Sequence, residues 1–305
     1  MSMNLVFSQI LIILTYVLIG YIAGKAGLIG KEQRVFLSKL CADLILPFTV
    51  ISATSQELDT NDVRNLLIGT ALTLAVFLGV TFVSVFAHRL AGADRARMSV
   101  ITGLVTYPNC TFLGLPLCLA LFGDIAILYS AVMIIVFNVL FFTLQYTLFL
   151  KDKPSIRNLC TPTMISTLLM LFMLALKLRF PAPLQTAFSS IGSIISPLSL
   201  IIIGVMLSEN RLLRILTEKS SYAVVFVRNL LIPLLVILLL KPLPLDTTSK
   251  MCLLVYLGCP CATLTSIYAM RLDIEPVLCV NSVLLSTLFF TLTLPLIILI
   301  GQFLL

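Results

Sequence analysis

The chain has 305 residues, of which 60% are hydrophobic and 11% are charged, and its mean hydropathy is +1.14. Soluble domains carry roughly 25% charged residues, so this composition excludes a soluble protein and predicts an all-α polytopic membrane protein. The net charge of +7 is typical of basic loops beside a membrane, and we expect a lipid bilayer and no nucleic acid as partner.

Cysteine and histidine usage argues against a redox or metal centre. The eight cysteines lie mostly inside apolar runs, and the chain has a single histidine, so we predict buried thiols, no disulfides and no metal site. No catalytic cluster, phosphate loop or cofactor motif is apparent, and we expect a protein that is not an enzyme. The first apolar run lacks an Ala-x-Ala-like site, so we expect it to remain as a helix of the mature protein.

Ten apolar runs predict ten membrane spans joined by short loops. Their expected bounds, good to a few residues, are about 4–24, 35–54, 64–87, 97–121, 125–150, 161–178, 186–207, 221–240, 250–270 and 276–303.

Basic residues predict the orientation of these spans. One set of alternate connections holds fourteen of them: Lys25, Lys31, Arg34, Lys39, Arg89, Arg95, Arg97, Lys151, Lys153, Arg157, Arg211, Arg214, Lys219 and Arg271. The other set holds five: Arg64, Lys177, Arg179, Lys241 and Lys250. Because cytoplasmic loops are enriched in Lys and Arg, the first set is predicted to be cytoplasmic and both termini to lie outside. We expect a multi-pass protein of the bacterial inner membrane.

Two halves of five spans, residues 1–150 and 151–305, resemble each other weakly. Leu46-Pro47 in span 2 corresponds to Ser196-Pro197 in span 7, and Pro108 in span 4 corresponds to Pro260 in span 9. Because five is an odd number, a duplicated half would insert upside down. The pattern therefore favours two inverted repeats.

The two prolines Pro108 and Pro260 interrupt their spans beside polar residues. Pro108-Asn109-Cys110-Thr111 and Pro260-Cys261-Ala262-Thr263 would each end one half-helix and begin another. Unpaired backbone at membrane depth is tolerated where it lines a cavity or packs against protein, and matched breaks point to a transporter's substrate site. A plain proline kink is the alternative for either span taken alone.

Three further polar residues lie inside spans. Arg228 in span 8 would bind an anion, neutralise a carboxylate or hold half-helix ends, unless it snorkels to the interface. Asp43 in span 2 is a candidate for proton or cation coupling, or else pairs with Lys39 one turn away. Asn138 in span 5 is expected to form an interhelical hydrogen bond, and contact with a ligand is the alternative or additional role.

Over nearly its whole length the chain resembles the auxin efflux carrier family, which includes bacterial malate and malonate permeases and the plant auxin exporters. The similar residues are Pro108-Asn109, Phe112-Leu113-Gly114-Leu115-Pro116-Leu117, Phe122-Gly123-Asp124, Asn138, Leu46-Pro47, Gly204, Pro233 with the basic residue before it, and the Pro260 region through Leu272. Where many relatives have Asn beside the second proline, this chain has Cys259 and Cys261.

The resemblance implies ten helices in two inverted five-helix repeats, an architecture like that of bile-acid symporters and antiporters. Spans 1, 2, 6 and 7 would form a scaffold that dimerises through spans 2 and 7. Spans 3–5 and 8–10 would form a transport domain in which the broken helices 4 and 9 cross. The long cytoplasmic loop of the plant exporters is absent after Leu150.

We therefore expect a secondary active transporter of small organic anions, such as malate, malonate or auxin-like acids, that works by elevator-type alternating access. The candidate substrate-binding residues are Pro108, Asn109, Cys110, Thr111, Gly114, Asn138, Arg228, Pro260, Cys261 and Thr263, with Asp43 as the coupling candidate. No cofactor is expected beyond a coupling Na⁺ or H⁺. The alternatives are a cation/proton antiporter on the same architecture and a non-transporting membrane sensor.

Overall fold

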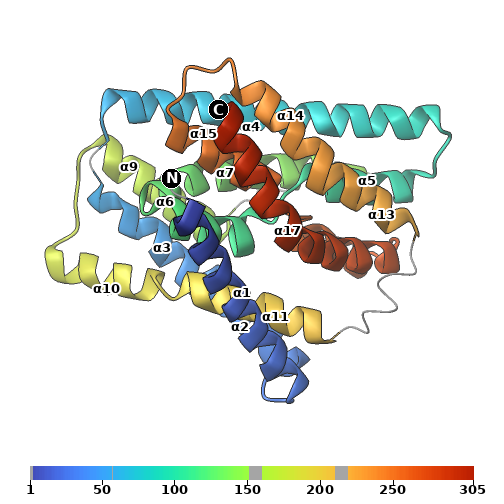
Figure 1. The fold of residues 1–305 in the computed structure, drawn as a ribbon, viewed down its shortest axis with the longest axis horizontal. Coiled ribbons are helices and arrows are strands. Elements are labelled where there is room, and N and C mark those ends of the chain that lie inside the picture. Colours follow the sequence, from blue (N-terminus) through green and yellow to red (C-terminus); the bar gives the residue numbers. More distant parts are fainter. Residues whose placement is uncertain (1–2, 57, 151–159, 210–218) are drawn as a thin grey trace. The chain divides into compact units, whose positions relative to one another are not determined.

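The computed structural model describes residues 3–56, 58–150, 160–209 and 219–305, and the described residues are helical apart from short connections (Figure 1). The helices of the first half are α1 (Met3–Lys25), α2 (Lys31–Leu40), η1 (Cys41–Ile45), α3 (Leu46–Ser52), η2 (Ala53–Ser55), α4 (Thr60–Leu90), α5 (Arg95–Thr106), η3 (Cys110–Gly114), α6 (Leu115–Phe122), α7 (Ile125–Leu140), η4 (Phe141–Gln145) and α8 (Tyr146–Leu150). Those of the second half are α9 (Pro162–Ala175), α10 (Ala182–Gly192), α11 (Ile195–Glu209), α13 (Lys219–Phe226), η6 (Val227–Leu231), α14 (Ile232–Leu240), α15 (Thr247–Gly258), α16 (Thr263–Arg271) and α17 (Pro276–Leu304).

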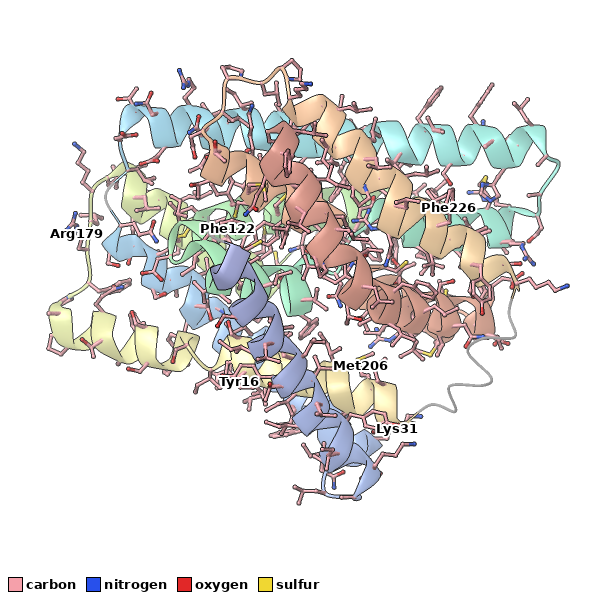
Figure 2. All side chains as sticks on the ribbon, in the orientation of Figure 1. Tyr16, Lys31, Phe122, Arg179, Met206 and Phe226 are labelled. Atoms are coloured by element: carbon pink, nitrogen blue, oxygen red, sulfur yellow. The ribbon has the colours of Figure 1, made fainter. Side chains whose placement is uncertain are left out.

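Each of the ten predicted apolar runs falls mainly on helical residues, and the runs 97–121 and 250–270 are interrupted at residues 107–109 and 259–262. Among the described residues, six helical stretches are long and apolar enough to cross a membrane: Lys31–Ser55, Thr60–Leu90, Ile125–Phe149, Ala182–Ser208, Lys219–Leu240 and Pro276–Leu304. Large apolar side chains project from their outer faces, and Phe226 at the end of α13 is 54% exposed (Figure 2). A bilayer is the solvent in which such a surface is stable. The polytopic membrane class is thus confirmed, while the count of ten spans stays a prediction.

Three of the π-helical turns precede a proline by two positions. The turns η1, η3 and η6 are followed by Pro47, Pro116 and Pro233. A proline ring clashes with the carbonyl four residues earlier, and in each case that carbonyl lies inside the wider π turn. The turns therefore let these spans continue past a proline without a full break.

The helices form two compact units that interleave along the chain: Met1–Leu67 with Thr111–Ile135 and Arg157–Asn210, and Ile68–Cys110 with Val136–Ile156 and Arg211–Leu305. They are called here unit 1 and unit 2. In unit 1, α1 packs along α11, and α3 packs against α9 and α10. In unit 2, α17 packs against α13, α15 and α16, and α5 packs against α16.

Glycines bring α1 and α11 into backbone contact in unit 1. A Cβ added at Gly20 would overlap the Ile201 carbonyl, and one at Gly204 would overlap the Val17 carbonyl. Small residues on both helices thus allow the close packing of these spans.

The predicted orientation depends in part on connections that lie outside the described residues. Residues 151–159 and 210–218, with their five basic side chains, belong to those connections. The orientation therefore stays a prediction.

Candidate functional site

The breaks in spans 4 and 9 lie side by side within unit 2. The helix α5 ends at Thr106 and α15 ends at Gly258, and the segments that follow form an antiparallel bridge between Pro108 and Cys261. The Asn109 N–H donates to the Pro260 carbonyl at 2.7 Å, and the Ala262 N–H donates to the Tyr107 carbonyl at 3.0 Å. Backbone groups that each helix leaves unpaired are thus satisfied by the other. The two prolines do not produce simple kinks, because both helices stop.

Arg228 lies where the ends of α5 and α15 meet, and its side chain is 1% exposed. Its Nε donates to the Cys259 carbonyl at 2.8 Å, its Nη1 to the Val105 carbonyl at 3.0 Å and the Thr106 carbonyl at 3.4 Å, and its Nη2 to the Leu257 carbonyl. Arg228 thus contacts carbonyls at both half-helix ends, which is one of the roles considered from the sequence. Snorkelling to the interface is excluded, because the guanidinium is enclosed by protein.

The position of Arg228 follows from its own helix. It lies in the π turn η6, and Pro233 follows two residues beyond that turn; a Cβ added at Gly258, at the end of α15, would lie 3.6 Å from Pro233 Cγ. The neighbouring Asn229, 2% exposed, donates through Nδ2 to the Ser286 carbonyl of α17 at 2.7 Å. The turn that carries Arg228 is therefore tied to α17 through Asn229.

Ser286 ties α17 to the second break. Its hydroxyl accepts the Cys261 N–H at 3.1 Å and donates to the Val283 carbonyl at 3.0 Å. The Cys261 amide is thus satisfied although it lies outside any helix. Ser286 was not predictable as a site residue, since a serine inside an apolar helix carries no local signal of a distant partner.

The start of α16 faces Asn109. The N-cap of this helix is Ala262, which offers no side-chain acceptor to the first amides, so a half-helix begins here with an uncapped positive end. Asn109 is 7% exposed, and its Nδ2 donates to the Thr263 hydroxyl at 3.4 Å. Asn109 of the first broken span and Thr263 of the second, both predicted site residues, thus lie in contact.

An aromatic cluster surrounds the first break. The ring of Tyr107, fully buried, makes edge contacts with Phe77 at 5.4 Å, Phe137 at 5.3 Å and Phe141 at 5.2 Å between centroids. Such packing fixes the residue before the proline. No local pattern in the sequence distinguishes these buried aromatic residues from aromatic residues that face lipid.

Gly103 lets α5 and α16 approach closely. A Cβ at this position would lie 2.7 Å from Thr265 Cγ2 and 2.9 Å from Gln145 Nε2. The Thr265 hydroxyl donates to the Gly103 carbonyl at 3.3 Å, and Gln145 Nε2 donates to the Ser99 carbonyl at 2.7 Å. The half-helices before the first break and after the second are therefore joined by polar contacts.

The remaining predicted residues are placed as follows. Cys110 and Cys261 are buried and form no disulfide in the described chain, and Asn138 is 9% exposed. Thr111 and Gly114 lie in η3 and belong to unit 1. Asp43, also in unit 1, is exposed and forms no ion pair with Lys39 in the described chain; it lies inside the π turn Cys41–Ile45, which changes the helical spacing from Lys39.

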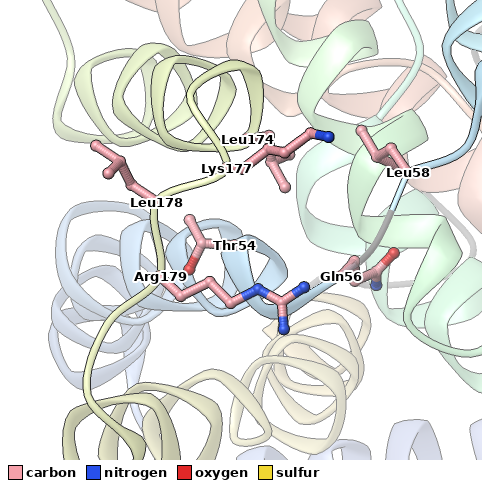
Figure 3. Close-up of a pocket in the computed structure, with 7 residues that line it drawn as sticks. All are labelled: Thr54, Gln56, Leu58, Leu174, Lys177, Leu178 and Arg179. Carbon is pink, nitrogen blue, oxygen red and sulfur yellow. The ribbon is translucent and has the colours of Figure 1, made fainter.

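Among the described residues, no cluster of His, Cys, Asp or Glu could hold a metal ion. A separate cavity of about 340 Å³ opens in unit 1 (Figure 3). Its walls include Gln56, Lys177 and Arg179 beside three leucines, and none of the predicted site residues lines it.

Comparisons with known proteins agree with the membrane character of the chain. The family model described as "Membrane transport protein" matches residues 5–156 and 147–298. The chain is also similar to an uncharacterized transporter, MJ1031, of Methanocaldococcus jannaschii, with 26% identity over 119 residues. That match covers 38% of this chain and 38% of the relative's length.

Proposed function

Because the chain belongs to the membrane transport protein family, the family of the auxin efflux carriers, we propose that it is a secondary active transporter of small organic anions. The observation that carries the proposal is the bridged pair of helix breaks with Arg228 buried between them. Matched broken spans are where secondary transporters bind their substrates. Mono- and dicarboxylates such as malate, malonate or auxin-like acids are the proposed substrates.

The electrostatics of the crossing favour an anion. The guanidinium charge of Arg228 roughly balances the partial negative charges at the ends of α5 and α15. The N-terminal end of α16 keeps its partial positive charge, because Ala262 provides no cap. Asn109 and Thr263 offer an amide and a hydroxyl beside it. A carboxylate would accept from these groups, with Pro108, Cys110, Asn138, Pro260 and Cys261 of the same unit completing the proposed site.

The proposed transport cycle is elevator-type alternating access by ten spans in two inverted repeats. The matched segments 5–156 and 147–298 are close to the proposed halves 1–150 and 151–305. Spans 1, 2, 6 and 7 would be the scaffold, and spans 3–5 and 8–10 the moving domain. We further propose a homodimer through spans 2 and 7, in a bacterial inner membrane with both termini outside.

A cation/proton antiporter is the weaker proposal for this chain. Such a protein would use a titrating carboxylate or the carbonyls of the breaks. The described carboxylates make no contact with Arg228, and carbonyls at both half-helix ends already accept from it. These contacts favour an anionic substrate.

Counterflow in proteoliposomes tests the proposal. Vesicles loaded with unlabelled malate, malonate or an aromatic monocarboxylate should accumulate the matching labelled acid. Asn109→Ala should raise KM about five- to tenfold, as expected for a lost hydrogen bond worth about 1 kcal/mol, with an unchanged melting temperature. Asn61→Ala, at the exposed start of α4, is the control and should behave as wild type. Absence of exchange for every acid in the panel, with folded protein, would contradict the proposal.

A further inference from the structure

The C-terminal ends of α5 and α15 form a place where a cation is expected. Each helix end carries roughly half a negative charge and carbonyl groups without helical partners. In secondary transporters with broken helices, such ends and the unwound carbonyls coordinate the coupling cation. In this chain both ends lie in unit 2, next to η6.

Arg228 already occupies that place. Its three nitrogens donate to carbonyls of both half-helices: Val105 and Thr106 at the end of α5, and Leu257 and Cys259 at the end of α15. One guanidinium charge matches two half-charges of opposite sign. Arginine stays protonated under physiological conditions, so this charge is permanent.

We propose that Arg228 is a built-in cation that replaces a coupling Na⁺ at the crossing, so that the breaks bind no soluble cation. This deepens the proposed function by specifying its coupling, and rests on it for what is transported. The claim about cation binding itself concerns the folded protein alone. It follows that removal of the guanidinium leaves a carbonyl-lined gap that free guanidinium ion can fill.

The test uses the purified full-length protein in detergent. Melting temperatures are measured in NaCl, KCl and choline chloride at equal ionic strength, each with and without guanidinium chloride far below its denaturing range. The wild type should melt at one temperature in all three salts. Arg228→Ala should melt lower and recover part of the difference with guanidinium. Arg271→Ala, which removes an exposed arginine at the end of α16, should not recover.

In proteoliposomes, Arg228→Ala should lose counterflow roughly tenfold or more, and guanidinium should restore part of it. The inference is overturned if Na⁺ specifically raises the wild-type melting temperature, or if guanidinium does nothing for a folded Arg228→Ala protein. Should that variant not fold, the wild-type salt series and Arg228→Lys decide. Lysine keeps the charge but has a single nitrogen, so Arg228→Lys should melt at a lower temperature than the wild type. Its melting temperature should not depend on Na⁺, and a Na⁺-dependent rise would overturn the inference.

The two proposals fail separately. Guanidinium recovery and Na⁺ indifference, found together with no carboxylate exchange, would support the built-in cation and contradict the proposed substrate class. Carboxylate exchange that requires Na⁺ would support the proposed substrate class and contradict the built-in cation.

Discussion

At the scale of single residues, Arg228 supplies hydrogen bonds that neither lipid nor water would provide at this depth. Burial of a charged side chain costs several kcal/mol, and an arginine is stable there only if its donors are used. Donation to four carbonyls meets that requirement, with each hydrogen bond to a charged group contributing about 1.5–3 kcal/mol. Lysine could not reproduce this geometry, because all the N–H donors of its ammonium group lie on a single nitrogen.

Gly103 carries the first prediction at this scale. Gly103→Ala should destabilise the protein by about 1–3 kcal/mol, because its Cβ would meet Thr265 Cγ2 at 2.7 Å and Gln145 Nε2 at 2.9 Å. Adding Thr265→Ser, which removes the nearest atom and keeps the hydroxyl, should restore part of the loss. Thermal unfolding followed by size-exclusion chromatography measures both effects.

The control is Gly79→Ala in α4, where an added Cβ meets nothing within 4 Å. It should be neutral or stabilising by up to about 1 kcal/mol. Equal melting temperatures for the two alanine variants would show that α5 and α16 do not need the close approach.

At the scale of elements, π turns decide which side chains point where. One residue advances an α-helix by about 100°, so a π turn, which accommodates one extra residue, rotates everything on one side of it relative to the other. The turn η6 contains Arg228 itself, and Pro233 follows it. We infer that this proline maintains the turn and so aims the guanidinium.

Replacing the proline tests that link. Pro233→Ala restores an N–H donor and removes the ring that clashes with the Asn229 carbonyl, so η6 should relax toward a regular α-helix. Arg228 would then turn away from the half-helix ends, and both the melting temperature and counterflow should fall.

Pro47→Ala makes the same change behind the π turn η1 in unit 1 and serves as the matched control. Its KM for the exchanged acid should stay at the wild-type value. Wild-type stability and transport in Pro233→Ala would mean that some other contact positions Arg228.

At the scale of the whole molecule, hydropathy predicted which segments lie in the membrane but not which segments pack against one another. The apolar runs and the breaks at Pro108 and Pro260 were predictable, because periodicity and proline chemistry are local. The partners of Arg228 were not, since the Val105 carbonyl is 123 residues away in the chain. The same holds for Ser286 beside Cys261, and for the grouping of Thr111–Ile135 with unit 1 and not with the half-helix that precedes it.

Orientation in the membrane gives the last prediction, and the structure simplifies its test. Seven of the eight cysteines are buried, and Cys160 alone is exposed. Cys160 directly precedes α9 and follows the basic connection that we predict to be cytoplasmic. A membrane-impermeant maleimide should therefore modify the wild-type protein only after the cells are permeabilised.

Two engineered cysteines in a Cys160→Ser background extend the test. Thr247→Cys, at the exposed start of α15, should react in intact cells because the connection before it is predicted to lie outside. Ser155→Cys, in a segment outside the described residues, should react only after permeabilisation, as Cys160 does. The Cys160→Ser protein itself is the blank and should stay unlabelled, because burial protects the other thiols. The opposite pattern of labelling would invert the orientation without changing the positions of the helices, since the count of basic residues chooses only between two orientations of the same spans.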